Sequence, residues 1–213
     1  MLLRLALAAA MMPPVLPVVA TAPVLLSRPL LQDVLAEMEE ETLASASDPK
    51  PEATPDPEPK ATKRYVCKTC TPNEQKVLKI LQDRGIHDKA ALAVVMGNIK
   101  QESKFHPNIC EGGARVNYEH CHRGGFGLLQ WTTVGRYQGL GRHARSMGLS
   151  PTSLEAQMSW LFTEVEFKKI EHILKSPGRS IDSYMRASYR WIGWGAHGAR
   201  TAYAHEYYNK FTF

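Results

Sequence analysis

The stretch "NIKQESKFHPN", residues 98–108, places a carboxylate, Glu102, at the end of an apolar helical run. Glu102 follows Ile99 by three residues and Val95 by seven, so the helical period puts it beside the apolar stripe. Because an apolar border disfavours the charged form of a carboxylic acid, the pKa of Glu102 is expected to rise towards neutrality. Such an acid can protonate a glycosidic oxygen. The alternative is an ordinary helix-end charge that caps the helix or pairs with a neighbour such as Lys104.

A second candidate, "GGFGLLQW", residues 124–131, follows about twenty residues after Glu102. Its glycines allow positive φ and close backbone approach, so a polymer can lie against the main chain. Gln130 offers a donor and acceptors suited to an acetamido group, and Trp131 offers a flat face for a sugar ring. The alternative is a tight turn with a core aromatic side chain.

Retaining and inverting glycosidases use a second carboxylate, about 5 Å or 6.5–9.5 Å from the acid respectively. The candidates for this group are Glu111 and Glu119, which lie in the loop between the two motifs. The alternative is that both are solvated loop acids.

The four cysteines fall into two pairs, Cys67 with Cys70 and Cys110 with Cys121. One interpretation is disulfide bonding, which an exported domain would favour, and a Cys110–Cys121 bond would order the loop that carries Glu111. A zinc site that also recruits neighbouring histidines is the second interpretation, and free or redox-active thiols are the third. No spacing singles out a cysteine nucleophile with a paired base.

The charge of the chain is unevenly distributed. Residues 1–63 carry five Lys/Arg against nine Asp/Glu, whereas residues 64–213 carry twenty-one against twelve. A basic domain suits an anionic partner, such as nucleic acid, anionic lipid or a bacterial wall. Because the positive residues are dispersed and no nucleic-acid-binding motif is present, we expect no nucleic-acid partner.

Three segments precede the domain at 64–213. Residues 1–26 form an apolar leader that fits an export signal, a membrane anchor or a docking segment, although its prolines would interrupt a spanning helix. Residues 27–46 read as an acidic amphipathic helix. Residues 47–63 are a proline-rich linker, which we expect to be extended and disordered.

The domain itself is expected to be mainly helical. Thr71, Asp88 and Ser153 are the predicted N-caps of three helices. The glycine-rich segment 106–131 is expected to be irregular or to hold a small hairpin. The predicted helices cover residues 71–85, 87–105, 150–176 as one long helix, 180–192 and 199–211, with "GWGAHG" dividing the last two.

Taken in order, "VVMGNIKQESKFHPN", "GGFGLLQWTTVGRYQGL" and "SLEAQMSWLFTEVE" resemble the phage tail lysozyme family. That family belongs to the lysozyme-like superfamily, near the lytic transglycosylases and goose-type lysozymes. The resemblance covers roughly residues 72–175, with a weaker echo in "ARTAYAHEYYNKF". It implies a mainly α, lysozyme-like α+β fold whose glycine-rich loop lines a glycan cleft.

The resemblance also implies roles for individual residues. Glu102 matches the catalytic acid, and Ser103 matches the residue that helps to hold the cleft geometry. The substrate-lining segment corresponds to Gly127, Leu128 and Gln130. The chain departs from the family pattern at its loop cysteines and in "WIGWGAHG".

The expected function is cleavage of the β-1,4 bond between N-acetylmuramic acid and N-acetylglucosamine in peptidoglycan, without a cofactor or metal. In the superfamily's transglycosylases the substrate's own N-acetyl group or 6-hydroxyl replaces the second carboxylate, so hydrolase and transglycosylase both stay open. We expect a virion tail protein whose partners are peptidoglycan and other tail proteins, with a membrane contact through residues 1–26 if the leader is an anchor. The alternatives are an exported enzyme acting in the periplasm or wall, and an inactive wall-binding or structural component.

Overall fold

The computed structural model describes residues 63–213. The expected leader, the acidic helix and all but the last residue of the proline-rich linker therefore lie outside the described residues. No helix within 63–213 is long and apolar enough to cross a membrane.

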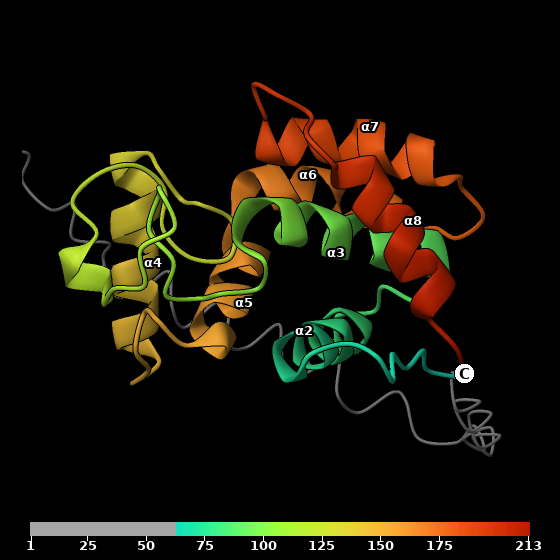
Figure 1. The fold of residues 1–213 in the computed structure, drawn as a ribbon, viewed down its shortest axis with the longest axis horizontal. Helices are drawn as coiled ribbons and strands as arrows, with labels where there is room; N and C mark the ends of the chain where they lie inside the picture. Colours follow the sequence, from blue (N-terminus) through green and yellow to red (C-terminus); the bar gives the residue numbers. More distant parts are fainter. Residues whose placement is uncertain (1–62) are drawn as a thin grey trace, which may run out of the picture. The chain divides into compact units, whose positions relative to one another are not determined.

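The described part of the chain is helical (Figure 1). Its β-type pairing is limited to isolated bridges, so the mainly α fold class is confirmed for these residues. The helices are α2 (Pro72–Asp83), α3 (Lys89–Ser103), the 3-10 helix η1 (Tyr118–His120), α4 (Val134–Ser146), α5 (Leu154–Thr163), α6 (Val165–Lys175), α7 (Ile181–Ile192) and α8 (Arg200–Lys210).

The three predicted N-caps are confirmed. Thr71 forms a capping box with Glu74 at the start of α2. The Asp88 side chain accepts hydrogen bonds from two backbone N–H groups at the start of α3, and Ser153 caps α5 in the same manner. The Asp88 cap fixes where α3, the helix that carries Glu102, begins.

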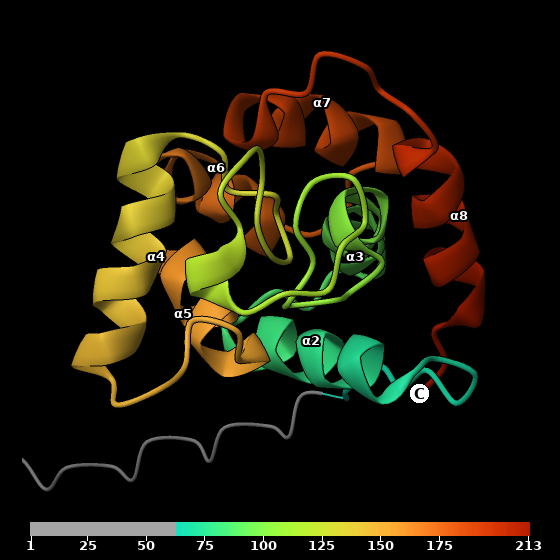
Figure 2. The same ribbon diagram turned by 60° about the vertical axis from the view of Figure 1, so that its left-hand side comes forward.

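Helix α3 is the central element of the domain. Its residues from Ala90 to Ile99 are all buried, and α2, α6, α7 and α8 pack around it (Figure 2). The closest of these contacts is with α8. A Cβ added at Gly97 would lie 2.7 Å from the Ala204 backbone nitrogen and 2.8 Å from the Arg200 carbonyl oxygen. Glycine at this position therefore sets the distance between the two helices.

The prediction of one long helix over 150–176 is wrong, because the chain breaks at Glu164 into α5 and α6. Glu164 has an extended backbone, with φ −63° and ψ 132°. Its carboxylate accepts hydrogen bonds from the Trp131 indole and the Arg136 guanidinium. Contacts distant in sequence hold Glu164 at this bend, so local helical periodicity gives no sign of it.

Helix α4 is an element that the sequence periodicity does not indicate. It contains three glycines, which weaken helix propensity. Two of them, Gly139 and Gly141, are covered by the Trp160 ring and the Tyr118 hydroxyl, which a Cβ would approach to within 2.5–2.6 Å. Close packing against aromatic side chains therefore accounts for both of these glycines.

The loop 106–131 lies between α3 and α4 in both views of the fold (Figures 1 and 2). The expected hairpin appears only as single bridges, which pair Ile109 with Arg115, Cys110 with Phe126, and Phe126 with Trp131. A Cys110–Cys121 disulfide closes the middle of the loop.

We predict that Gly97→Ala lowers the free energy of unfolding by about 1–3 kcal/mol, because the new methyl group overpacks the contact between α3 and α8. Denaturant unfolding measures the effect. Gly135→Ala is the matched control, since it is also helical and has open space at its Cβ. It should leave stability unchanged or raise it by up to about 1 kcal/mol. Equal stability of the two variants would contradict the close helix contact.

Candidate active site

Glu102 lies in the last turn of α3, and its side chain is 16% exposed. Its partner is Arg200, the first residue of α8, whose guanidinium donates a hydrogen bond to Glu102 Oε1. The Arg200 side chain is 5% exposed and also donates to the carbonyl of His197 at 2.8 Å. The ion pair is therefore with Arg200 and not with Lys104, whose Nζ instead donates to the Tyr203 hydroxyl at 2.7 Å.

Opposing effects act on the pKa of Glu102. Burial raises the pKa, while the positive charges of Arg200 and Arg136 lower it, and burial prevails. The direction agrees with the one expected from the border of the apolar stripe. Within residues 63–213 the carboxylate accepts a side-chain hydrogen bond from Arg200 at Oε1, and Oε2 has no hydrogen-bond partner there.

Ser103 fixes the turn that follows Glu102. Its buried hydroxyl donates to the Ile99 carbonyl at 3.1 Å and accepts from the Phe105 backbone N–H at 3.2 Å. Lys104 and Phe105 both have positive φ, at 51° and 61°, which is unusual for residues with a side chain. The Ser103 hydroxyl therefore supports a backbone turn of uncommon geometry directly beside the carboxylate.

The glycine-rich loop is attached to α5 by hydrogen bonds with Gln157, a fully buried residue of that helix. Its Oε1 accepts from the Leu128 backbone N–H at 2.8 Å, and its Nε2 donates to the carbonyls of Pro107 and Pro151 at 2.6 and 2.7 Å. A Cβ at Gly127 would lie 2.5 Å from the same amide. Gly127 and Leu128 are thus buried, and they contact the Gln157 amide that attaches the loop to α5.

Gln130 is partly exposed, unlike Gly127 and Leu128. It has a left-handed backbone, with φ 48°, and its Nε2 donates to the Gly127 carbonyl at 3.1 Å. A Cβ at Gly125 would lie 2.6 Å from Gln130 Cβ. Glycine at position 125 therefore leaves space for the Gln130 side chain. Among the predicted sugar contacts Gly127, Leu128, Gln130 and Trp131, Gln130 is the partly exposed one.

The prediction that Trp131 offers a face to a sugar ring is wrong. Trp131 is fully buried, and its indole N–H donates to Glu164 Oε1 at 3.0 Å. The same carboxylate accepts two hydrogen bonds from Arg136, at 2.6 and 2.9 Å. Trp131 is therefore the core aromatic of a tight turn, which was the alternative interpretation.

The two loop acids differ in their contacts. Glu111 is exposed, and its Oε2 accepts a hydrogen bond from the Gly125 N–H at 3.1 Å. A Cβ at Gly124 would collide with the Glu111 side chain from its Cβ onward, and Gly124 has a φ of 71°, so glycine is favoured there. Glu119 is also exposed, in η1. Glu111 is thus the acid that is attached to the glycine-rich loop.

Both cysteine pairs are disulfides, Cys67–Cys70 and Cys110–Cys121, and residues 63–213 contain no free cysteine. The structure therefore agrees with the disulfide interpretation of both pairs. The described residues also contain no group of three or more His, Cys, Asp or Glu side chains that could hold a metal ion.

Three residues of the site do not emerge from the sequence reasoning. Arg200 lies ninety-eight positions from Glu102, and Arg136 belongs to the helix that periodicity does not indicate. Gln157 belongs to the quoted motif "SLEAQ", but it sits in an ordinary helical pattern. The motif was the one available signal for Gln157.

A helical domain with a partly buried carboxylate at the end of its central helix, followed in the chain by a glycine-rich loop that a disulfide closes, is consistent with a lysozyme-like fold. Comparison with protein families agrees: the phage tail lysozyme model matches residues 72–211. The chain belongs to the phage tail lysozyme family, and the match extends through α8 and so includes Arg200. Membership supports a glycosidase that acts on peptidoglycan. A search of curated proteins gives no match.

We predict that the Glu102 carboxyl titrates above its ordinary value of 4.5 in an NMR pH titration. Glu206 is an internal reference, because Lys100 and Lys210 hold the pKa of that carboxyl below its ordinary value. A Glu102 pKa at or below that of Glu206 would contradict the account of its environment.

The same shift predicts a pH-dependent stability. A raised pKa means that the folded state binds the proton more tightly than the unfolded state. The resulting stabilisation is complete below pH 4.5 and is lost as the pH rises through the folded pKa. The unfolding free energy of the wild type, measured relative to Glu102→Gln, should therefore fall as the pH rises from about 4 towards neutrality.

Proposed function

We propose that this protein cleaves the β-1,4 bond between N-acetylmuramic acid and N-acetylglucosamine in peptidoglycan, with Glu102 as general acid. The observation that carries the proposal is the state of this carboxylate, whose pKa is raised by burial and whose Oε2 is not taken by Arg200. The family supplies the substrate class. As the family's description suggests, we place the protein in a virion tail, acting on the bacterial wall.

In the first step, protonated Glu102 donates its proton to the glycosidic oxygen. The bond between that oxygen and C1 of N-acetylmuramic acid breaks, the N-acetylglucosamine side leaves as an alcohol, and positive charge develops at C1. Burial raises the pKa of Glu102, so it favours the protonated form that this step requires. Arg200 then pairs with the carboxylate that forms, so its buried charge favours the proton transfer.

The second step decides the product. If water attacks C1 and loses its proton, the product has a reducing end. If the 6-hydroxyl of the same sugar attacks and gives its proton to the Glu102 carboxylate, the product is a 1,6-anhydro sugar. We assign water activation to Glu111, because its carboxylate is fixed to Gly125 on a loop that a disulfide closes.

The remaining site residues would position the glycan. Gln130 is the proposed contact to an acetamido group, since it is the partly exposed polar side chain of the segment 124–131. Gln157, Ser103 and the buried Trp131 would act through the backbone that they hold, without touching the substrate.

We predict that Glu102→Gln in the full chain abolishes clearing in a peptidoglycan zymogram, with a loss of activity of about 100-fold or more. Glu166→Gln is the matched control, because Glu166 is an exposed residue whose surface pair with Lys169 contributes little to stability. Circular dichroism verifies that both variants fold. Clearing by Glu102→Gln equal to that of the control would sink the catalytic assignment.

Mass spectrometry of the released muropeptides tests the assignment of Glu111. We expect reducing ends, and a loss of turnover in Glu111→Gln that Glu119→Gln does not share. If turnover by Glu111→Gln is unchanged and the ends are 1,6-anhydro, the second step belongs to the substrate and Glu111 leaves the proposed site.

A further inference from the structure

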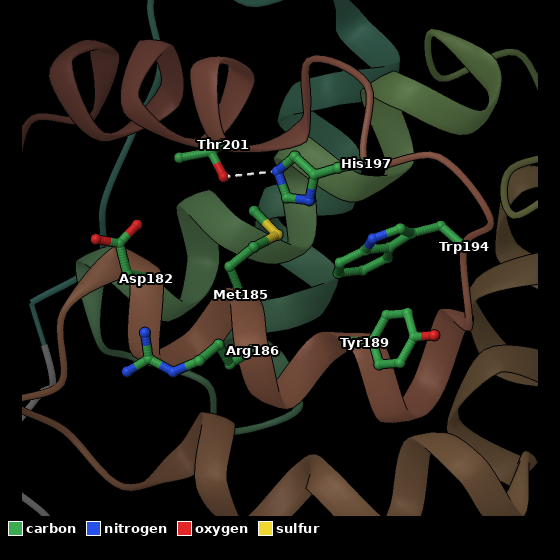
Figure 3. A pocket seen from close by; sticks show the side chains of 7 residues that line it. All are labelled: Asp182, Met185, Arg186, Tyr189, Trp194, His197 and Thr201. Carbon is green, nitrogen blue, oxygen red and sulfur yellow. Dashed lines mark hydrogen bonds between the residues drawn. The ribbon is translucent and has the colours of Figure 1, made fainter.

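We propose that the groove between α7 and the start of α8 is a second sugar subsite, which binds an N-acetylated pyranose of the same glycan strand. This inference rests on the proposed function. The groove encloses about 400 Å³, within the ~300–1,000 Å³ typical of small-molecule sites. Its floor is Met185, and its walls are Asp182, Arg186, Tyr189, Trp194, His197 and Thr201 (Figure 3).

The two tryptophans of the segment "WIGW", residues 191–194, differ in exposure. Trp191 is buried at 2% exposure and packs on Phe167 in the core. Gly193 then ends α7 with a left-handed backbone, φ 64°, and this turn brings Trp194 to the wall of the groove. Trp194 is therefore the tryptophan of this segment that a ligand can reach.

Aromatic side chains gather at one end of the groove (Figure 3). The Trp194 ring meets Tyr189 edge to face at 5.1 Å and His197 at 5.3 Å. Tyr189 is 53% exposed. The C–H groups on the face of a pyranose carry partial positive charge, so they pack favourably on the negative faces of aromatic rings.

Polar side chains occupy the opposite end of the groove (Figure 3). Asp182 and Arg186 lie one helical turn apart on α7, and within residues 63–213 neither takes part in an ion pair. On α8, Thr201 hydrogen-bonds His197 at 2.8 Å. A balanced pair of opposite charges suits hydroxyl and acetamido groups, which both donate and accept, better than it suits an anion.

The groove adjoins the proposed catalytic acid through two contacts. The Arg200 guanidinium lies over the Trp194 ring, 4.9 Å from its centroid, and the same guanidinium pairs with Glu102. Trp194 is therefore separated from Glu102 by a single side chain. This adjacency is the basis for assigning the groove to the same glycan strand as Glu102.

The experiment measures binding without turnover, in full-length protein that carries Glu102→Gln. The probe is the β-1,4-linked hexamer of N-acetylglucosamine, which has no peptide, and isothermal titration calorimetry gives Kd. We expect Tyr189→Ala and Asp182→Ala each to weaken binding by roughly 3- to 10-fold. Tyr189→Phe should restore Kd to within about twofold, because it retains the aromatic ring.

Tyr208→Ala is the matched control, because Tyr208 is an exposed tyrosine outside the groove. Thermal unfolding verifies that each variant folds. The subsite is contradicted if Tyr189→Ala binds like this control, or if the parent binds only muropeptides that carry a stem peptide and not the hexamer. The proposed function is contradicted by a different result, which is clearing of peptidoglycan by Glu102→Gln in the zymogram.

Discussion

The ion pair between Glu102 on α3, which is partly buried, and the buried Arg200 on α8 is the interaction on which the proposed site depends. A buried charge is tolerated only when a partner and hydrogen bonds compensate it, and removing one partner leaves the other uncompensated. The pair therefore requires α8 to dock closely on α3, which the glycine at position 97 allows. The close packing of α3 and α8 is therefore also a requirement for the pairing of Glu102 with Arg200.

The rest of the site is built around that pair by buried polar groups. Gln157 attaches the glycine-rich loop to α5, and Glu164 joins the Trp131 indole to Arg136 on α4. Arg136 in turn lowers the pKa of Glu102. The bend at Glu164 interrupts a continuous helical pattern, and in return it places a carboxylate between the loop and α4. The helical pattern is thus interrupted at the residue whose carboxylate bonds both Trp131 and Arg136.

Local signals in the sequence predicted much of the fold. The three N-caps and the ends of α2 and α3 follow from capping residues, stop signals and apolar periodicity, and the glycine-rich "GWGAHG" marks the break between α7 and α8; all of these are local properties. The break at Glu164 and the buried position of Trp131 depend on tertiary contacts, so periodicity could not reveal them. The position of Glu102 beside the apolar stripe was enough to indicate the direction of its pKa shift. The same local pattern could not identify Arg200 as the partner of Glu102, because Arg200 is remote in sequence.

In the proposed mechanism Glu102 acts as an acid whose strength Arg200 sets, so the pH profile of kcat/KM for peptidoglycan cleavage should depend on the charge of residue 200. The alkaline limb of that profile reports the pKa of the general acid in the free enzyme. Arg200→Met removes the charge that lowers this pKa, so the alkaline limb should move to higher pH, whereas Arg200→Lys, which keeps the charge, should move it less. An alkaline limb that stays in place in Arg200→Met, or that moves to lower pH, would contradict the account.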